Sequence, residues 1–261
     1  MSIFATNILE GQVALVTGGG TGIGQEIART LASHGARLCI AARRQEVLEE
    51  AKLGFEEEGF ECLAVPCDVR KPDQVEAVIQ ETLARFGRLD IVVNNAAGNF
   101  PAPMAGISYN GFKSIVDIDL LGTYNVSKAA YDAWLAENGG NIVNITAPFE
   151  QMGPAFQAHV AAAKTGVNSL TRTCAVEWGP KGIRTNAVAP GAISNTEGLE
   201  RFEKVGDDSR PQSPLGRAGS KREIANTVLF LVSEAASYVS GQVIYVDGLS
   251  LIHISEPTRP Y

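Results

Sequence analysis

Long apolar runs, basic clusters and a secretion signal are all missing from this sequence. No apolar run approaches the ~20 residues of a membrane-spanning helix, and the first residues carry no basic region followed by an apolar stretch. The net charge is −7, which argues against nucleic acid as a partner. We therefore expect a cytoplasmic protein that binds neither a membrane nor nucleic acid.

Cysteine is also scarce, with four residues in a chain of 261. Their spacing matches no metal-ligand motif, so we expect no metal site. Cys39 falls in a strand-like run and Cys174 in a helical one, which favours buried free thiols over disulfides. The same expectation holds for Cys62 and Cys67.

No Pro/Gly/Ser-rich linker divides the chain, so residues 1–248 are predicted to form a single domain. Short apolar runs alternate there with longer amphipathic ones. The apolar runs lie at 13–16, 38–41, 63–66, 91–93, 142–145, 185–188 and 243–246. The helical patterns lie at 22–34, 45–58, 71–86, 109–136, 156–179 and 221–232. This alternation predicts an α/β, Rossmann-type doubly wound parallel sheet of seven strands, with ligands beyond the carboxyl ends of the strands.

Residues 249–261 differ in character from the rest of the chain. They begin LSLIHISEPTR, which resembles the translation of a sequencing-library adapter. We expect this tail to be foreign and to encode no function. A natural polar tail is the alternative.

The turn after the first apolar run carries the pattern of a phosphate-binding loop. Residues 17–24 read TGGGTGIG and open a helix. Glycine is needed there because a Cβ would block the tight turn and the approach of a pyrophosphate, while the helix N-terminus offers free N–H groups and a positive dipole. The alternative is a tight strand–helix turn that binds no ligand. The predicted cofactor contacts in this loop are Gly18, Thr21, Gly22, Ile23 and Gly24.

The end of the second apolar run predicts which dinucleotide binds. An NAD site places a carboxylate there to accept hydrogen bonds from the ribose hydroxyls, but this sequence has Ala42 followed by Arg43. A guanidinium can hold the 2′-phosphate of NADP in bidentate fashion. We therefore predict NADP as the cofactor, held by Arg43. Arg44 is a second phosphate contact or a solvated residue at the start of the next helix.

Three further landmarks accompany the glycine loop: NNAAG at 94–98, Lys164 within a helical pattern, and Pro190-Gly191 after an apolar run. Together these landmarks resemble the short-chain dehydrogenase/reductase family. The family's proton-donating Tyr stands one helical turn before the Lys, and Val160 occupies that place; the family's Ser falls on Ala147. The resemblance therefore implies the fold and cofactor site of the family without the acid that ketone reduction requires.

The resemblance also implies contacts to each part of the cofactor. It assigns the adenine to Asp68 and Val69. It assigns the adenosine ribose to the segment 94–98, with Asn95, Ala96, Ala97 and Gly98 as the contacts. It assigns the nicotinamide ribose to Lys164, and the nicotinamide amide to Pro190, Gly191, Ile193 and Thr196.

Within the family, the sequence resembles the 2,4-dienoyl-CoA reductases, the peroxisomal type above all. AAGNF at 96–100, DID at 117–119 and the tyrosine-free segment 159–164 carry this resemblance. It implies a catalytic pair of Asp119 and Lys164. A Tyr that another type of this enzyme uses falls on Phe149, and Asn99 and Phe100 are further candidate substrate contacts. His159 either reaches the substrate from the first helical turn or has a capping or packing role.

The implied reaction is NADPH-dependent reduction of a 2,4-dienoyl-CoA to a 3-enoyl-CoA in fatty-acid β-oxidation. The alternatives are reduction of another enoyl or acyl thioester, and a cofactor-binding protein without activity. The resemblance also implies a homotetramer that pairs the helices at 109–136 and 156–179. Tyr131, Trp134 and Trp178 would contribute apolar area to that interface, or would pack in the core.

Overall fold

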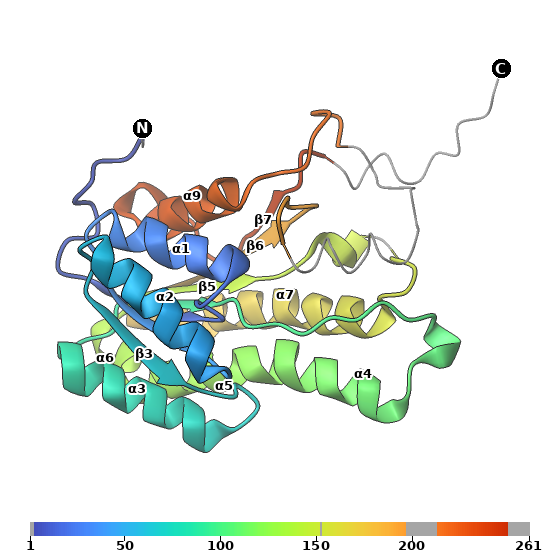
Figure 1. Cartoon of the computed structure of the whole chain (residues 1–261), viewed down its shortest axis with the longest axis horizontal. Helices are drawn as coiled ribbons and strands as arrows, with labels where there is room; N and C mark the ends of the chain where they lie inside the picture. The colour runs from blue at the N-terminus through green and yellow to red at the C-terminus, as the bar shows by residue number, and fades with distance from the viewer. Residues whose placement is uncertain (1–2, 152, 197–212, 250–261) are drawn as a thin grey trace.

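The computed structural model describes residues 3–151, 153–196 and 213–249 (Figure 1). Its centre is a parallel sheet of seven strands in the order β3-β2-β1-β4-β5-β6-β7. The strands are β1 (Val13–Thr17), β2 (Arg37–Ala42), β3 (Cys62–Pro66), β4 (Ile91–Asn94), β5 (Gly140–Ile145), β6 (Ile183–Pro190) and β7 (Val243–Val246). Each predicted apolar run is a strand of this sheet, and the predicted doubly wound fold is confirmed.

Helices cover both faces of the sheet. They are α1 (Gly22–Ala32), α2 (Gln45–Glu57), α3 (Pro72–Phe86), α4 (Tyr109–Val116), α5 (Gly122–Ala130), α6 (Ala136–Asn138), α7 (Ala158–Trp178) and α9 (Lys221–Val232). Figure 1 shows α1, α2 and α9 on one side and α3, α4 and α5 on the other. Because each face is covered, strands such as β1 and β2 are mostly apolar on both faces.

Strand β1 shows how alternation divides the core. Ala14 and Val16 pack in the core under α1, α2 and α9. Val13 and Leu15 point to the opposite face and pack in the core under α3 and α5. Successive side chains of a strand point to opposite faces, so one short apolar run supplies both cores.

The predicted helix at 109–136 is helical but not an α-helix throughout. A π-helical turn at Asp117–Leu121 separates α4 from α5, and a second one at Tyr131–Leu135 separates α5 from α6. Each π turn holds more residues than an α turn and shifts the side chains that follow around the axis. The first of them carries Asp119, which is fully buried.

The four cysteines are buried free thiols, as predicted. Burial raises the pKa of Cys39 and of Cys62 to about 12 in each case. Because the thiolate is the reactive form, these thiols are chemically inert at neutral pH.

Three other predictions concern membranes, the C-terminal tail and metals. Within the described ranges, no helix is long and apolar enough to cross a membrane. Residues 250–261, which make up nearly all of the tail expected to be foreign, lie outside the described residues. Among the described residues, no group of histidine, cysteine and carboxylate side chains is arranged to hold a metal ion.

Candidate active site

The predicted site residues gather at the carboxyl edge of the sheet. Gly18 follows β1, Arg43 follows β2, Asn95 follows β4 and Gly191 follows β6. The parallel strands bring these positions to one edge although they are far apart in the chain. This is the edge at which doubly wound sheets bind their ligands.

The glycine loop is held in place by Asn95. The Asn95 Nδ2 donates to the carbonyl oxygens of Thr17, at 3.0 Å, and Gly18, at 3.3 Å. Gly18 has φ +66°, and a Cβ on it would lie 2.8 Å from that same amide nitrogen. A Cβ on Gly24 would lie 2.3 Å from the Gly18 carbonyl oxygen. Side chains are therefore excluded at both glycines by the close approach of backbone and amide.

Gly22 differs from these two glycines. Its φ is +62°, yet a Cβ there would meet no atom within 4 Å, so the space beside it is open. Helix α1 begins at this residue, and the Thr21 side chain makes no capping hydrogen bond. The first amides of the helix therefore face a ligand site that is shaped and polarised for a phosphate.

Arg43 and Asp68 mark the adenosine end of the site. Arg43 is exposed directly after β2. The Arg70 guanidinium hydrogen-bonded to Asp68 holds the pKa of that carboxyl below its usual value, and the charge of Arg43 acts in the same direction. Arg43 therefore lies near enough to Asp68 for its charge to act on that carboxyl. Arg70 was missed: its Nε lies 2.9 Å from Asp68 Oδ1, and a short-range pair in a loop has no distinctive sequence pattern.

The predicted catalytic pair is assembled in the structure. Lys164 Nζ lies 3.4 Å from Asp119 Oδ2 and donates to the Ile145 carbonyl oxygen at 3.0 Å. The Gly98 N–H donates to Asp119 Oδ1 at 2.7 Å. The two side chains are 7% and 0% exposed. Asp119 Oδ2 accepts no hydrogen bond from the described residues, so one carboxylate oxygen remains open to a further donor.

Val160 and Ala147, which occupy the positions of the family's Tyr and Ser, have no side-chain group that can donate a proton. Val160 is buried in an apolar cluster with Ile115 and Ala163. Phe149, a candidate substrate residue, packs against the same cluster. Ala147 has no polar side-chain atom. This part of the site is therefore unable to protonate a developing alkoxide.

A series of hydrogen bonds among buried polar side chains connects the Asp119 backbone to the sheet. The Thr123 Oγ1 donates to the Asp119 carbonyl oxygen at 2.7 Å, and the Ser127 Oγ donates to the Thr123 carbonyl oxygen at 2.8 Å. The Asn94 Nδ2 donates to Ser127 Oγ at 2.9 Å and to Asn144 Oδ1 at 2.8 Å. These bonds tie α5 to β4 and β5. This polar chain was not predicted. The sequence signal for it is a buried asparagine on each of two neighbouring strands, Asn94 on β4 and Asn144 on β5.

The candidate substrate residues lie where α7 begins. The Asn99 Nδ2 lies 3.4 Å from Gln157 Oε1. The Phe100 and His159 rings meet edge to face, with centroids 4.4 Å apart and planes at 62°. Burial lowers the pKa of His159, while the Phe100 main chain and the charge of Asp119 oppose that change. Neither ring nitrogen of His159 makes a hydrogen bond of ordinary geometry with the described residues, and the ring packs against Phe100.

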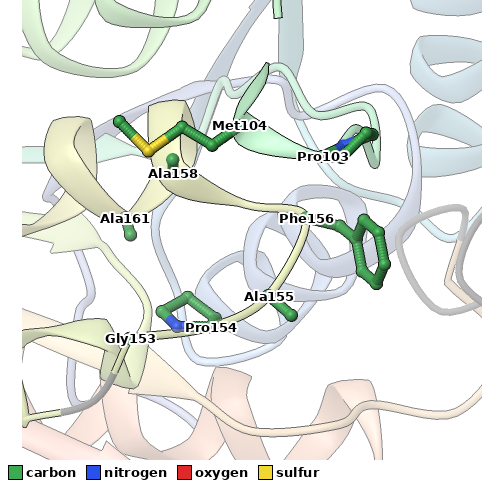
Figure 2. A pocket seen from close by; sticks show the side chains of 8 residues that line it. All are labelled: Pro103, Met104, Gly153, Pro154, Ala155, Phe156, Ala158 and Ala161. Atoms are coloured by element: carbon green, nitrogen blue, oxygen red, sulfur yellow. The ribbon is translucent and has the colours of Figure 1, made fainter. Parts of the chain in front are cut away.

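An apolar groove of about 490 Å³ lies at the start of α7 (Figure 2). Figure 2 shows Pro103 and Met104 on one wall, and Phe156, Ala158 and Ala161 on the other. A backbone hydrogen bond from the Ala102 N–H to the Phe156 carbonyl oxygen, at 3.0 Å, joins the two walls. Such a groove suits an unbranched apolar chain. It was not predicted, because its two walls are distant in sequence.

The segment after β6 turns back on itself. A Cβ on Gly191 would lie 2.7 Å from the Asp247 Cα, which accounts for glycine there. Ile193 is buried and forms a parallel bridge with Gly219. The Thr196 Oγ1 donates to the Ile193 carbonyl oxygen at 2.8 Å. The contact of Pro190 and these residues with a nicotinamide stays a prediction.

Comparison with known proteins agrees with this geometry. The model of the family described as enoyl-(acyl carrier protein) reductase matches residues 18–248. A peroxisomal 2,4-dienoyl-CoA reductase of Danio rerio, named as producing (3E)-enoyl-CoA, is 47% identical over 252 residues, 94% of this chain and 83% of the relative. A probable 2,4-dienoyl-CoA reductase of Bacillus subtilis, named as producing (2E)-enoyl-CoA, is 41% identical over 245 residues, 92% and 96% of the two chains.

Solved structures agree as well. A citronellol catabolism dehydrogenase of Pseudomonas aeruginosa has a TM-score of 0.86 at 37% identity, with 95% of this chain and 98% of that chain covered. A short chain dehydrogenase from Bacillus anthracis has the same TM-score at 39% identity, with 95% and 100% covered.

The fold and the site together define an oxidoreductase that uses a nicotinamide cofactor. The chain belongs to the short-chain dehydrogenase/reductase family.

Proposed function

We propose that this protein reduces 2,4-dienoyl-CoA thioesters to 3-enoyl-CoA with NADPH. The observation that carries the proposal is the buried pair of Lys164 and Asp119 beside the two empty acid positions, Val160 and Ala147. A ketone reductase needs a hydroxyl acid next to the hydride acceptor. A conjugated thioester does not, because its negative charge forms on a distant oxygen.

The residues present fit NADPH. The open space beside Gly22 and the uncapped start of α1 suit the pyrophosphate, and Arg43 suits the 2′-phosphate. When bound there, NADPH supplies the hydride. Lys164 is a buried residue of α7. Its ammonium group would hold the nicotinamide ribose through the N–H donors that do not contact Ile145 or Asp119.

The overall change takes one hydride at C5 and one proton at C2 of the dienoyl chain. The C4=C5 and C2=C3 double bonds are lost, and a C3=C4 double bond forms. Between the two additions, negative charge delocalises to the thioester oxygen. Asp119 and Lys164 form a buried charge pair that would relay the proton and balance this charge.

The groove in Figure 2 supplies room for the acyl chain. Its side chains are apolar, and it lies at the start of α7. The relatives quoted above are named for CoA thioesters, which supports the same class of substrate here.

One assay tests the proposal. Purified protein is given NADPH with hexa-2,4-dienoyl-CoA, a 2-enoyl-CoA or a 3-oxoacyl-CoA, and NADPH oxidation is followed by absorbance. We expect turnover of the dienoyl-CoA and little reduction of the 3-oxoacyl-CoA. Robust ketone reduction would contradict the proposal, turnover of only the 2-enoyl-CoA would favour the enoyl-reductase alternative, and no turnover of any thioester would favour the inactive alternative.

The same reaction run in deuterated water identifies the product. Protonation at C2 places deuterium on C2 of a 3-enoyl-CoA, whereas protonation at C4 places it on C4 of a 2-enoyl-CoA. The two relatives named above differ in this respect. We expect deuterium on C2.

We further propose that the protein acts in the cytoplasm, in β-oxidation of unsaturated fatty acids, as a homotetramer. The exposed apolar side chains Tyr124, on α5, and Val176, on α7, support assembly through these helices. Tyr131 and Trp178, in contrast, stack on each other at 4.5 Å and pack against the chain's own core, as Trp134 also does. A fluorescent fusion protein tests the location.

A further inference from the structure

His159 is a buried side chain whose ring nitrogens make no hydrogen bond of ordinary geometry within the described part of the chain, although the Phe100 main chain acts on the ring. Its exposed fraction is 0%, and neither ring nitrogen makes a hydrogen bond with the described residues. Native proteins satisfy nearly all buried polar groups, because an unmade hydrogen bond costs free energy. His34 shows the usual outcome in this same chain: it is equally buried, and its Nδ1 lies 2.7 Å from the Thr30 carbonyl oxygen.

The surroundings place His159 against Phe100 and within the electrostatic field of Asp119. Its ring packs against Phe100, and the charge of Asp119 acts on it. Desolvation nevertheless keeps its pKa below the ordinary value, so the ring is neutral at neutral pH and carries one N–H to donate. Phe100 is 36% exposed, so the imidazole lies one side chain below the surface.

The other donors around the pair are engaged or are assigned to the cofactor. Lys164 Nζ donates to Ile145 and faces Asp119. The Thr146 Oγ1 donates to the Lys164 carbonyl oxygen at 3.1 Å. Val160 has no donor. Lys164 keeps N–H donors, but these are assigned to the cofactor ribose, so the His159 ring is the donor left for the substrate.

We propose that His159 is a catalytic residue whose ring N–H donates a hydrogen bond to the thioester oxygen of the bound acyl-CoA. This inference rests on the proposed function. The hydrogen bond stabilises the negative charge that the oxygen gains when hydride arrives at C5. The N–H proton stays on His159 throughout, and the proton that completes the reaction goes to C2 by a separate route. Substrate thus supplies the partner that His159 lacks.

Two variants at this position separate hydrogen bonding from packing. His159→Phe keeps a planar ring and removes the N–H, whereas His159→Gln keeps an N–H donor. With hexa-2,4-dienoyl-CoA we expect kcat to fall on the order of 10²-fold in His159→Phe and to recover in part in His159→Gln. NADPH affinity should be unchanged in both. The absorbance band of bound dienoyl-CoA should shift to the red with the wild type and His159→Gln, but not with His159→Phe, because a hydrogen bond to the carbonyl polarises the conjugated chain.

A measurement on the unaltered protein covers the case in which His159→Phe does not fold. The chain has three histidines, so protein labelled with ¹⁵N-histidine gives few ring signals. Adding hexa-2,4-dienoyl-CoA should move the His159 ring signal, identified by its absence from His159→Gln, and should leave the His34 signal in place.

The outcomes distinguish the two proposals. A wild type that turns over no dienoyl-CoA would overturn the proposed function and this inference with it. An active wild type whose His159 signal does not move on binding, or a folded His159→Phe variant with the kcat of the wild type, would overturn the inference alone.

Discussion

Lys164 Nζ lies between two oxygens, 3.0 Å from the Ile145 carbonyl oxygen and 3.4 Å from Asp119 Oδ2. The first contact fixes the ammonium group over the end of β5. The second brings a buried carboxylate to it from the π-helical turn at Asp117–Leu121. The end of β5 and the π-helical turn thus both contact one ammonium group at the point where the nicotinamide is predicted to lie.

Asp119→Asn tests the charge of this pair. The substitution keeps an acceptor for the Gly98 N–H but removes the negative charge beside Lys164. We expect kcat with dienoyl-CoA to fall by about 10²-fold or more, with NADPH binding retained, since the proton relay is lost. Asp117→Asn is the matched control: Asp117 forms an ion pair with Lys113 nearer the surface, and such pairs contribute little. Equal kcat values for Asp119→Asn and the wild type would contradict the assigned role.

Arg43→Ala tests the choice of cofactor. A charge-assisted hydrogen bond is worth about 1.5–3 kcal/mol, so the NADPH dissociation constant should rise by roughly 10- to 100-fold while that of NADH stays the same. Arg43→Asp should weaken NADPH binding further, because attraction becomes repulsion. Fluorescence titration measures both. A wild type that binds NADPH and NADH equally would remove the basis of this prediction.

The lowered pKa of His159 predicts a dependence of stability on pH. Its unfolded-state pKa is near the ordinary value of 6.5, and its folded-state pKa lies lower. The unfolded chain therefore takes up the proton first as the pH falls. The contribution of His159 to stability is fully present above pH 6.5 and is lost as the pH falls from there through the folded-state pKa.

Urea unfolding of the wild type and His159→Gln measures this contribution. Between about pH 8 and pH 5, the free energy of unfolding of the wild type should fall more than that of the variant, by about 1.4 kcal/mol for each unit by which the pKa is lowered. Asp119 and Lys164, the charged groups beside His159, are unchanged in both proteins. Equal losses would show that the ring titrates alike in both states.

Tyr124→Asp tests assembly. Tyr124 is 46% exposed on α5, and Leu121, one turn earlier, is 47% exposed. A charge at the centre of an apolar contact is expensive to bury, so the variant should form a smaller species than the wild-type tetramer in light scattering. Leu53→Asp, on the exposed side of α2, should leave the tetramer intact. A wild type that is monomeric at micromolar concentration would contradict the assembly.

The strands and the cofactor loop could be predicted from the sequence because their causes are local. A strand buried on both faces is apolar at every position, as residues 13–16 show, and no distant contact changes that requirement. The glycines at 18 and 24 are required by backbone that lies within the same loop, together with one amide from Asn95. Helix ends were also predicted closely, because they depend on neighbouring residues.

The site itself was only partly predictable. A resemblance named Asp119 and Lys164, but the distance between them, the burial of both and the Ile145 contact depend on how α4, α7 and β5 pack together. The π-helical turn that buries Asp119 was missed, because apolar periodicity is nearly the same for α- and π-helical turns over so short a stretch. The ion pair of Arg70 with Asp68 was missed because no sequence pattern distinguishes a short-range ion pair in a loop.

The amino-acid sequence alone determined the order of strands and helices along the chain, the position of the glycine-rich turn and the absence of the family's hydroxyl acid at Val160. These features depend on residue type and on near neighbours. The tertiary structure decided that His159 is buried without a partner, that Phe100 covers it, and that an apolar groove opens between Met104 and Phe156. Burial, pairing and open space depend on segments distant in the chain, and such segments meet only when the sheet and its helices pack.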